Sequence, residues 1–186
     1  MTCAESSPGW PPLTSLEGRR VTLRPFGPAD LTPGYAQWLN DPEVVRYSNQ
    51  RFRRHDAASC AAYLASFEGT DNIFLAIVGM AEARIVGTMT AYRNRHHGTV
   101  DVGILVGDRR VWGRGYGLEA WVLLAGWLLG AGGMRKLTCG TLACNGAMRA
   151  IAERSGMQLE GMRRAQEIVD GEPQDILYYA RFRGDS

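Results

Sequence analysis

Cysteine is scarce in this chain of 186 residues, and its spacing forms no pattern. Disulfide frameworks and zinc sites both need paired cysteines at short, regular intervals. The four cysteines, Cys3, Cys60, Cys139 and Cys144, are not arranged in that way. We therefore expect no metal site, and we interpret Cys139 and Cys144 as small apolar residues near a strand.

An excess of charge of one sign is also lacking. The chain has 21 Lys and Arg residues and 19 Asp and Glu residues, which gives a formal net charge of +2. Nucleic-acid binding needs a concentrated basic face, so we expect no nucleic-acid partner. Two short basic clusters occur, at residues 51–55 and 93–97. The second is interpreted as a solvated loop, and the first either as a solvated loop or as a rim that attracts an anion.

Long hydrophobic runs are missing as well. The longest apolar run, residues 120–133, is too short to span a bilayer and is interrupted by glycines. The N-terminus has no basic segment followed by an apolar stretch, so no secretory signal is expected. These features predict a cytoplasmic protein without membrane contact. With 45% hydrophobic and 22% charged residues, the chain is expected to form one globular domain.

The order of elements can be read from the periodicity of apolar residues and from turn residues. Residues 1–17 are rich in Ser, Pro and Gly and are expected to form a flexible leader, while residues 18–186 form the domain. The predicted strands are residues 21–24, 73–78, 84–92, 99–106 and 136–142, with two more in 158–182 joined near Asp170–Gly171. The predicted helices are residues 29–39, 56–67, 118–129 and 147–154.

The most informative segment is residues 110–117, which lies between a strand-like run and a helix-like run. Gly113, Gly115 and Gly117 allow tight turns and a close approach of the backbone to a ligand. The N–H groups there would stand at a helix N-terminus, which favours anions. Arg110 and Arg114 add positive charge. The segment therefore predicts a phosphate-binding cradle.

Other glycine-rich motifs explain this segment less well. A P-loop requires Lys and then Ser or Thr, and neither follows Gly117. The pattern Gly115-x-Gly117-x-x-Ala120 fits a loose dinucleotide fingerprint, but it does not follow its strand directly. An acidic residue is also expected about 20 positions further on, and residues 135–142 contain none. A module that binds NAD or ATP is thus a distant alternative.

The pattern Arg110-x-x-Gly113-x-Gly115 resembles the pyrophosphate-binding signature of the GNAT acyltransferases, which use acetyl-CoA. The segment from Trp112 to Ala120 is similar to the branch that acetylates ribosomal-protein alanines and amino sugars. Further similarities lie in residues 38–47, in residues 101–104 and in the interval from Asn145 to Gly156. The resemblance covers nearly all of the chain after residue 17.

This resemblance implies an α/β fold of the GNAT type. A mixed, mostly antiparallel central sheet with flanking helices is expected, with a cofactor cleft between its fourth and fifth strands. The implied reaction is transfer of an acetyl group from acetyl-CoA to a primary amine by direct attack on the thioester. Protein N-termini, amino sugars and other small amines are all candidate acceptors. Many members of the family dimerise, so a homodimer is one expected state.

The resemblance also assigns roles to residues of this chain. Asp101 is the candidate base, acting through water, with a solvated strand residue as the alternative interpretation. The residues implied in acetyl-CoA binding are Leu105, Val106, Gly107, Arg110, Trp112, Gly113, Arg114, Gly115, Tyr116, Gly117 and Asn145. Backbone N–H groups of residues 105–107 would stabilise the developing negative oxygen. Asn145 is also a favoured helix cap, and both roles can hold together.

The acceptor is expected to contact residues in the segment 38–51. These residues are Trp38, Arg46, Tyr47, Asn49 and Arg51. Their side chains suit a sugar, a peptide terminus or a small antibiotic, and core packing is the alternative for Trp38. Arg46 and Arg51 suit a phosphate or carboxylate, which favours a nucleotide-linked amino sugar.

No general acid for the leaving thiolate follows from the resemblance. The family often has tyrosine or serine at two positions that are Ala152 and Met148 here. Water could serve instead, or the hydroxyl of Tyr116, Tyr178 or Ser155. A catalytically silent module that binds acyl-CoA is therefore the main alternative to an enzyme.

Overall fold

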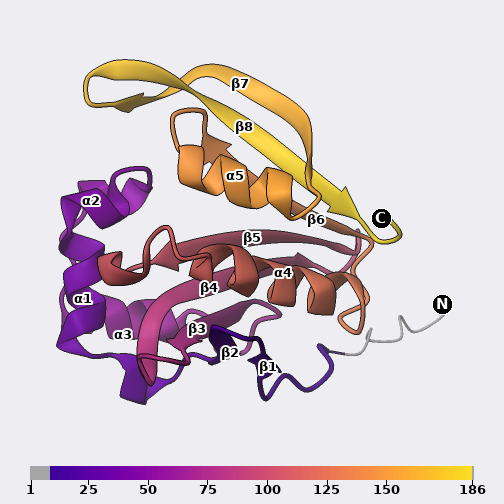
Figure 1. The fold of residues 1–186 in the computed structure, drawn as a ribbon, viewed down its shortest axis with the longest axis horizontal. Helices are drawn as coiled ribbons and strands as arrows, with labels where there is room; N and C mark the ends of the chain where they lie inside the picture. Colours follow the sequence, from indigo (N-terminus) through magenta and orange to yellow (C-terminus); the bar gives the residue numbers. More distant parts are fainter. Residues whose placement is uncertain (1–8, 186) are drawn as a thin grey trace, which may run out of the picture.

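One twisted sheet of eight strands runs through the computed structural model, which describes residues 9–185 (Figure 1). The strands are β1 (Leu16–Glu17), β2 (Val21–Pro25), β3 (Ile73–Gly79), β4 (Arg84–Asn94), β5 (Thr99–Val106), β6 (Lys136–Leu142), β7 (Gln158–Val169) and β8 (Glu172–Phe182). Their spatial order is β1-β2-β3-β4-β5-β6-β8-β7. All neighbours are antiparallel except β5 and β6, which are parallel.

The parallel pair is short, and this opens the sheet. β5 and β6 pair only from Thr99 to Asp101 and from Lys136 to Thr138. Beyond this point β6 continues to pair with β8 alone, as far as Leu142. A β-strand turns its N–H and C=O groups alternately to its two edges. Half of the backbone polar groups of residues 102–106 therefore face the gap, and the predicted mixed sheet with a split between two strands is confirmed.

Helices cover both faces of the sheet. The helices are α1 (Pro33–Asn40), α2 (Pro42–Val45), α3 (Ala57–Ala65), α4 (Tyr116–Leu129) and α5 (Gly146–Arg154), with short 3-10 turns η1 (Pro28–Asp30), η2 (Asn49–Phe52) and η3 (Arg109–Val111). On one face Trp121, Leu124 and Leu128 of α4 are almost fully buried against the sheet. On the other face Tyr35 of α1 packs with Phe74 of β3.

Local capping explains where several elements begin. The Asp56 carboxylate accepts a hydrogen bond from the Ser59 N–H at 2.8 Å and begins α3, as its sequence predicts. The Asp170–Gly171 turn joins β7 and β8, with positive φ at both residues. The bounds of β5 and β6 coincide with the predicted strands 99–106 and 136–142. The short helix α2 was not predicted.

Residues 16–17, at the end of the expected leader, form a strand. Residues 1–8 lie outside the described residues, but Leu16–Glu17 forms β1 and pairs with β2. The Trp10 ring lies 5.3 Å from the Trp127 ring of α4. The expectation of irregular structure is therefore wrong for residues 16–17, because tryptophan and leucine side chains at this end bury apolar area against the domain. No helix in residues 9–185 is long and apolar enough to cross a membrane.

Candidate active site

The glycine-rich loop forms an open cradle at the start of α4. Gly113 and Gly115 have φ values of 72° and 84°, which favour glycine, and Gly115 is the N-cap of the helix. A Cβ built at either residue would meet no atom within 4 Å, so this surface is open. Within residues 9–185, no backbone carbonyl accepts from the N–H groups of Gly113, Gly115 and residues 116–118. These donors at a helix N-terminus fit a pyrophosphate.

Gly117 has a different role in the same loop. A Cβ at this position would lie 3.2 Å from Ile151 Cδ1 of α5 and 3.3 Å from Val106 Cγ2 of β5. Such distances are tighter than ordinary van der Waals contacts. Gly117 therefore lets the first turn of α4 pack closely against both neighbouring elements.

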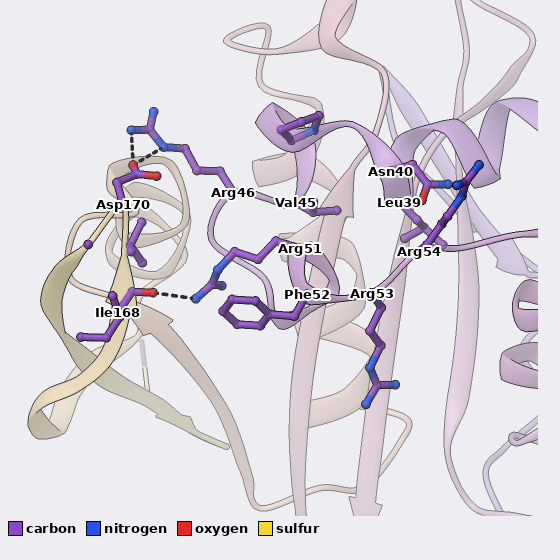
Figure 2. A pocket seen from close by; sticks show the side chains of 13 residues that line it. Leu39, Asn40, Val45, Arg46, Arg51, Phe52, Arg53, Arg54, Ile168 and Asp170 are labelled. Atoms are coloured by element: carbon purple, nitrogen blue, oxygen red, sulfur yellow. Dashed lines mark hydrogen bonds and ion pairs between the residues drawn. The ribbon is translucent and has the colours of Figure 1, made fainter.

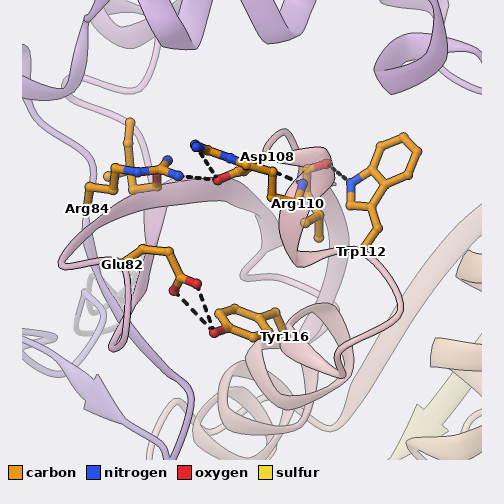
Figure 3. Close-up of polar contacts among 8 residues, drawn as sticks. Glu82, Arg84, Asp108, Arg110, Trp112 and Tyr116 are labelled. Atoms are coloured by element: carbon orange, nitrogen blue, oxygen red, sulfur yellow. Dashed lines mark hydrogen bonds and ion pairs between the residues drawn. The ribbon is translucent and has the colours of Figure 1, made fainter.

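A buried aspartate anchors the beginning of the loop (Figure 3). Asp108 accepts hydrogen bonds from the Arg110 N–H at 3.1 Å and from Arg110 Nε at 3.0 Å, and it also pairs with Arg84. Burial alone would raise the pKa of Asp108, but the hydrogen bonds from Arg110 and Arg84 outweigh it and lower the pKa to about 2. The Arg110 guanidinium thus has a carboxylate partner, whereas Arg114 is exposed and has no acidic partner among the described residues.

Two aromatic residues of the loop also make hydrogen bonds with their side chains (Figure 3). Trp112 Nε1 donates a hydrogen bond to the Val106 carbonyl at 2.8 Å, which ties the loop to the end of β5. The Tyr116 hydroxyl donates to Glu82, with oxygen distances of 3.1 and 3.2 Å. Tyr116 therefore contributes its backbone N–H to the cradle, while its side chain is held at the turn between β3 and β4.

The end of β5 is covered by an aromatic ring. A Cβ at Gly107 would lie 2.1 Å from the Trp38 ring of α1, so only glycine fits beneath it. Trp38 is half-buried and meets Tyr35 edge-on, with ring centroids 6.4 Å apart. This packing supports the structural interpretation of Trp38. Together, Trp38 and Trp112 fix the backbone of Leu105, Val106 and Gly107 at the edge of the gap.

Asp101 lies where β5 and β6 separate. It is the last residue of β5 that pairs with β6, and its carboxylate accepts a hydrogen bond from Thr138 Oγ1 at 2.9 Å. Asp101 is exposed at the surface, but the neighbouring strands partly desolvate its carboxylate and raise its pKa, and the Thr138 hydrogen bond opposes the shift without cancelling it. Its neighbour on β4 is Tyr92, whose hydroxyl is 2.9 Å from that of Tyr63 on α3. A carboxylate with a raised pKa at the point where two strands separate can accept a proton.

Asn145 caps the helix on the other side of the gap. Its Oδ1 accepts a hydrogen bond from the Met148 N–H at 3.1 Å at the start of α5. This confirms the capping interpretation. The amide Nδ2 has no hydrogen-bond partner within residues 9–185, so it can donate to a ligand while Oδ1 caps the helix.

The predicted acceptor residues lie mainly opposite the hairpin formed by β7 and β8 (Figure 2). Arg46 Nη2 is 2.8 Å from Asp170 Oδ2 at the hairpin tip. Arg51 Nη2 donates to the Ile168 carbonyl at 3.1 Å, and Asn49 Nδ2 lies 3.4 Å from a Glu167 carboxylate oxygen. Tyr47 is partly exposed beside Arg46. The hairpin thus brings together residues that are far apart in sequence.

The three candidate hydroxyls for protonating a thiolate differ in their surroundings. The Tyr116 hydroxyl donates a hydrogen bond to the Glu82 carboxylate. The buried Ser155 hydroxyl donates a hydrogen bond to the Ala152 carbonyl at 2.9 Å. The hydroxyl of Tyr178 on β8 has no hydrogen-bond partner among the described residues. A Cβ at Gly140 of β6 would lie 3.3 Å from Tyr178 Cε1, so the ring leans over β6.

The sequence did not indicate three parts of this site. Thr138 reaches Asp101 only because two distant strands are parallel neighbours, and no local pattern marks it. Asp108 looks like an ordinary turn residue before η3 is formed, although its place as an N-cap was a usable signal. The hairpin residues Glu167 and Asp170 are polar turn residues in the sequence, and their partners depend on the tertiary fold.

Comparisons with known proteins agree with this geometry. Residues 20–158 match the family model described as the acetyltransferase (GNAT) domain. A comparison with curated proteins found no significant match.

Solved structures show the same fold. An acetyltransferase of the GNAT family from Bacillus anthracis is 17% identical with a TM-score of 0.78, covering 91% of this chain and 99% of its own. A ribosomal-protein-S5-alanine acetyltransferase from Vibrio fischeri is 15% identical with a TM-score of 0.76, covering 92% and 98%. A spermidine N-acetyltransferase from Vibrio cholerae, solved with CoA and spermine, is 14% identical with a TM-score of 0.78, covering 89% and 97%.

Proposed function

The chain belongs to the GNAT acetyltransferase family, and from this premise we propose that it acetylates a primary amine that enters the gap between β5 and β6. It is an acetyl-CoA-dependent N-acetyltransferase. The observation that carries the proposal is that one strand, β5, connects the separation of the sheet with the cradle. Strands β5 and β6 separate at Asp101, and the same β5 leads into the open cradle at the start of α4. The acceptor in this proposal is a protein N-terminus, an amino sugar or another small amine.

The cradle is suited to the pyrophosphate of acetyl-CoA. Its unpaired N–H groups at Gly113, Gly115 and residues 116–118 and the exposed side chain of Arg114 supply donors and positive charge. Asn145 Nδ2 and the free edge of residues 102–106 would hold the pantetheine arm. When bound, acetyl-CoA supplies an acetyl thioester. The backbone N–H groups of residues 105–107 would stabilise negative charge that develops on the acyl oxygen.

Asp101 is proposed as the base. An alkyl amine is mostly protonated near neutral pH, so one proton must leave before its lone pair can attack. Asp101 takes this proton, directly or through one water molecule, and Thr138 holds the carboxylate in place. The raised pKa of Asp101 makes it a better proton acceptor than an ordinary aspartate.

Tyr178 is proposed as the group that protonates the departing sulfur. Its hydroxyl has no partner in residues 9–185, and its ring leans over Gly140 toward the gap. Thr138 and Gly140 lie two residues apart on β6 and therefore on one face of the sheet, so Tyr178 and the Thr138–Asp101 pair share that face. A proton donor at this place balances the proton taken by Asp101.

The Tyr178→Phe variant tests this assignment. We expect kcat to fall by about 10- to 100-fold, since general acid catalysis contributes typically 10²-fold or more and the thiolate is a fair leaving group. The KM for acetyl-CoA should stay close to that of the wild type. Ser155→Ala serves as the control and should leave kcat unchanged, because the buried Ser155 hydroxyl already donates its hydrogen bond to the Ala152 carbonyl. Wild-type kcat for Tyr178→Phe would leave water as the acid.

Acetyl-CoA consumption, measured as free thiol, tests the proposed function. The amine panel holds N-terminal peptides, nucleotide-linked amino sugars, aminoglycosides, polyamines and free amino acids. Transfer to any of them establishes the reaction and identifies the acceptor class. Binding of acetyl-CoA in a thermal-shift assay without transfer to any amine would instead favour a catalytically silent module.

A further inference from the structure

Two threonines of β4, Thr88 and Thr90, lie on the same face of the sheet as Asp101, but they have different neighbours. Thr88 is paired with Leu105 on β5, and Thr90 is paired with Gly103. Residues two apart on a strand point to one face, so Gly103 follows Asp101 on the face that Thr90 shares. Thr88 is buried, whereas Thr90 and Gly103 are half-buried and Asp101 is exposed. The surface beside Asp101 is therefore partly open at Thr90.

Gly103 leaves a bare spot in front of the Thr90 hydroxyl. A Cβ built on Gly103 would lie 2.8 Å from Thr90 Oγ1. Apart from the chain neighbours of Gly103, no other residue in the described part of the chain comes within 4 Å of that Cβ. Any side chain at this position would displace the Thr90 hydroxyl or cover it. Only glycine therefore keeps the hydroxyl facing the open surface.

The Thr90 hydroxyl is free to bind a ligand. It has no hydrogen-bond partner among residues 9–185, and it is not one of the buried polar atoms without a partner, so solvent reaches it. A hydroxyl oxygen can accept a hydrogen bond from an ammonium group. Asp101 lies two residues from Gly103, which is about 7 Å along the strand. A nitrogen bound in front of Thr90 Oγ1 is thus within reach of the Asp101 carboxylate through one water molecule.

Gly103 also lies at the free edge of β5. The pairing of β5 with β6 ends at Asp101, so residues 102–106 border the gap. In the proposed function the thioester arm lies along this edge. A nitrogen over Gly103 would therefore stand close both to the group that takes its proton and to the carbon that it attacks.

We propose that the Thr90 hydroxyl holds the acceptor nitrogen over Gly103, between the Asp101 carboxylate and the thioester. The inference rests on the proposed function and adds a residue that positions the acceptor. The ammonium group donates one N–H to Thr90 Oγ1, and a second N–H points to Asp101 or to a water molecule bound there. That second proton passes to Asp101, and the freed lone pair attacks the thioester carbon. Thr90 keeps its own proton throughout, and the sulfur that leaves is protonated as described above.

Thr90→Val tests the inference, since it removes the hydroxyl and keeps the shape of the side chain. Kinetics are measured with alanyl-alanine, glucosamine and spermidine, one amine from each candidate class. For each amine that the wild type acetylates, we expect kcat/KM to fall about tenfold or more, mainly through the KM for the amine, because hydrogen bonds to charged groups are strong. The KM for acetyl-CoA should stay close to that of the wild type. Thr90→Ser restores a hydroxyl and should recover most of the loss.

Thr88→Val is the matched control. It removes a hydroxyl from the same face of β4, where Leu105 lies opposite instead of glycine, and kcat/KM should be unchanged. Gly103→Ala should reproduce the loss, because its Cβ would displace the Thr90 hydroxyl. The double variant Gly103→Ala/Thr90→Val should be no worse than the more impaired single variant, since both changes remove the same contact.

The outcomes separate this inference from the proposed function. If the wild type acetylates an amine and Thr90→Val has the same kcat/KM, the inference is wrong and the proposed function stands. A fall in kcat/KM that Thr90→Ser does not recover, or that Thr88→Val shares, would also overturn the inference, because the effect would then come from the packing of β4. If the wild type binds acetyl-CoA and acetylates no amine, the proposed function is wrong and the inference falls with it.

Discussion

At the scale of single residues, two aspartates near the proposed active site have opposite pKa shifts. Partial desolvation raises the pKa of Asp101, because little compensates for its lost water. Asp108 is buried, unlike Asp101, but hydrogen bonds from Arg110 and Arg84 lower its pKa to about 2. The first is suited to accept a proton, and the second is held as a permanent anion that anchors a loop.

Asp101→Asn should lower kcat by about 10²- to 10⁴-fold, the usual range for a lost general base. The loss should be smaller at high pH, where more of the amine is already deprotonated. In the wild type, activity should fall as the pH drops through the raised pKa of Asp101. Acetyl-CoA affinity should be preserved, which a calorimetric titration checks. Wild-type turnover by Asp101→Asn across the pH range would remove this residue from the mechanism.

The same pKa shift has a consequence for stability. A carboxyl group whose folded-state pKa is raised binds its proton more tightly when folded, so ionisation above its unfolded pKa works against folding. Asp101→Asn should therefore not lower the free energy of unfolding at pH 7, as measured by urea denaturation. A loss of activity in this variant would then be due to chemistry and not to unfolding.

Asp108 should behave in the opposite way. Because its folded pKa is lowered to about 2, its contribution to stability is present above the unfolded pKa near 3.9 and is lost as the pH falls toward 2. Asp108→Asn should show a weaker acid dependence of unfolding than the wild type. It should also raise the KM for acetyl-CoA several-fold with little change in kcat, since Asp108 holds Arg110 and η3 below the cradle. An unchanged KM would limit Asp108 to a structural role.

At the scale of elements, we propose that the start of α4 decides cofactor binding. The Gly115 N-cap has a left-handed backbone, and a Cβ built at Gly113 or Gly115 would meet no atom within 4 Å. The loop is tied at one end by the Trp112 hydrogen bond to Val106 and at the other by the packing of Gly117. A loop fixed in this way loses little entropy when an anion binds.

Gly115→Glu should abolish CoA binding, because a carboxylate would occupy the cradle and repel the pyrophosphate. Gly115→Asn is the matched control, since asparagine tolerates the left-handed conformation and adds no charge. It should retain much of the affinity. Thermal shift with CoA measures both variants. CoA affinity that is unchanged in Gly115→Glu would contradict the cradle.

At the scale of the whole molecule, contacts between segments that are distant in the sequence hold the domain together. Trp10 packs against Trp127 of α4, and the Arg93 guanidinium lies 4.5 Å from the Trp10 ring. The hairpin tip meets α2 and η2 through Arg46 and Arg51 at the wide end of the gap. A homodimer stays a prediction, and light scattering would test it.

Trp10→Ala should lower the free energy of unfolding by about 1–3 kcal/mol, less than the 3–5 kcal/mol typical of a fully buried tryptophan because Trp10 is only partly buried. Chemical denaturation measures the change. Trp10→Phe should recover most of the loss, since a smaller ring can still stack on Trp127. Equal stability of Trp10→Ala and the wild type would show that this contact contributes nothing to the free energy of unfolding.

The sequence by itself determined the order of the elements and the position of the cradle. The bounds of β5, β6 and the β7–β8 turn follow from apolar periodicity and turn residues, because these signals are local in the chain. Gly113 and Gly115 mark the cradle because positive φ is a property of single residues. Asp101 was identified by its resemblance to a family pattern, and its catalytic role stays a prediction.

Only the tertiary structure decided which side chains meet. The hydrogen bond from Thr138 to Asp101, the Trp38 ring on Gly107 and the hairpin residues that engage Arg46 and Arg51 join segments separated by many residues. The partial desolvation that raises the pKa of Asp101 likewise depends on neighbouring strands. Such contacts are set by strand pairing and by packing between layers, and no local pattern encodes them.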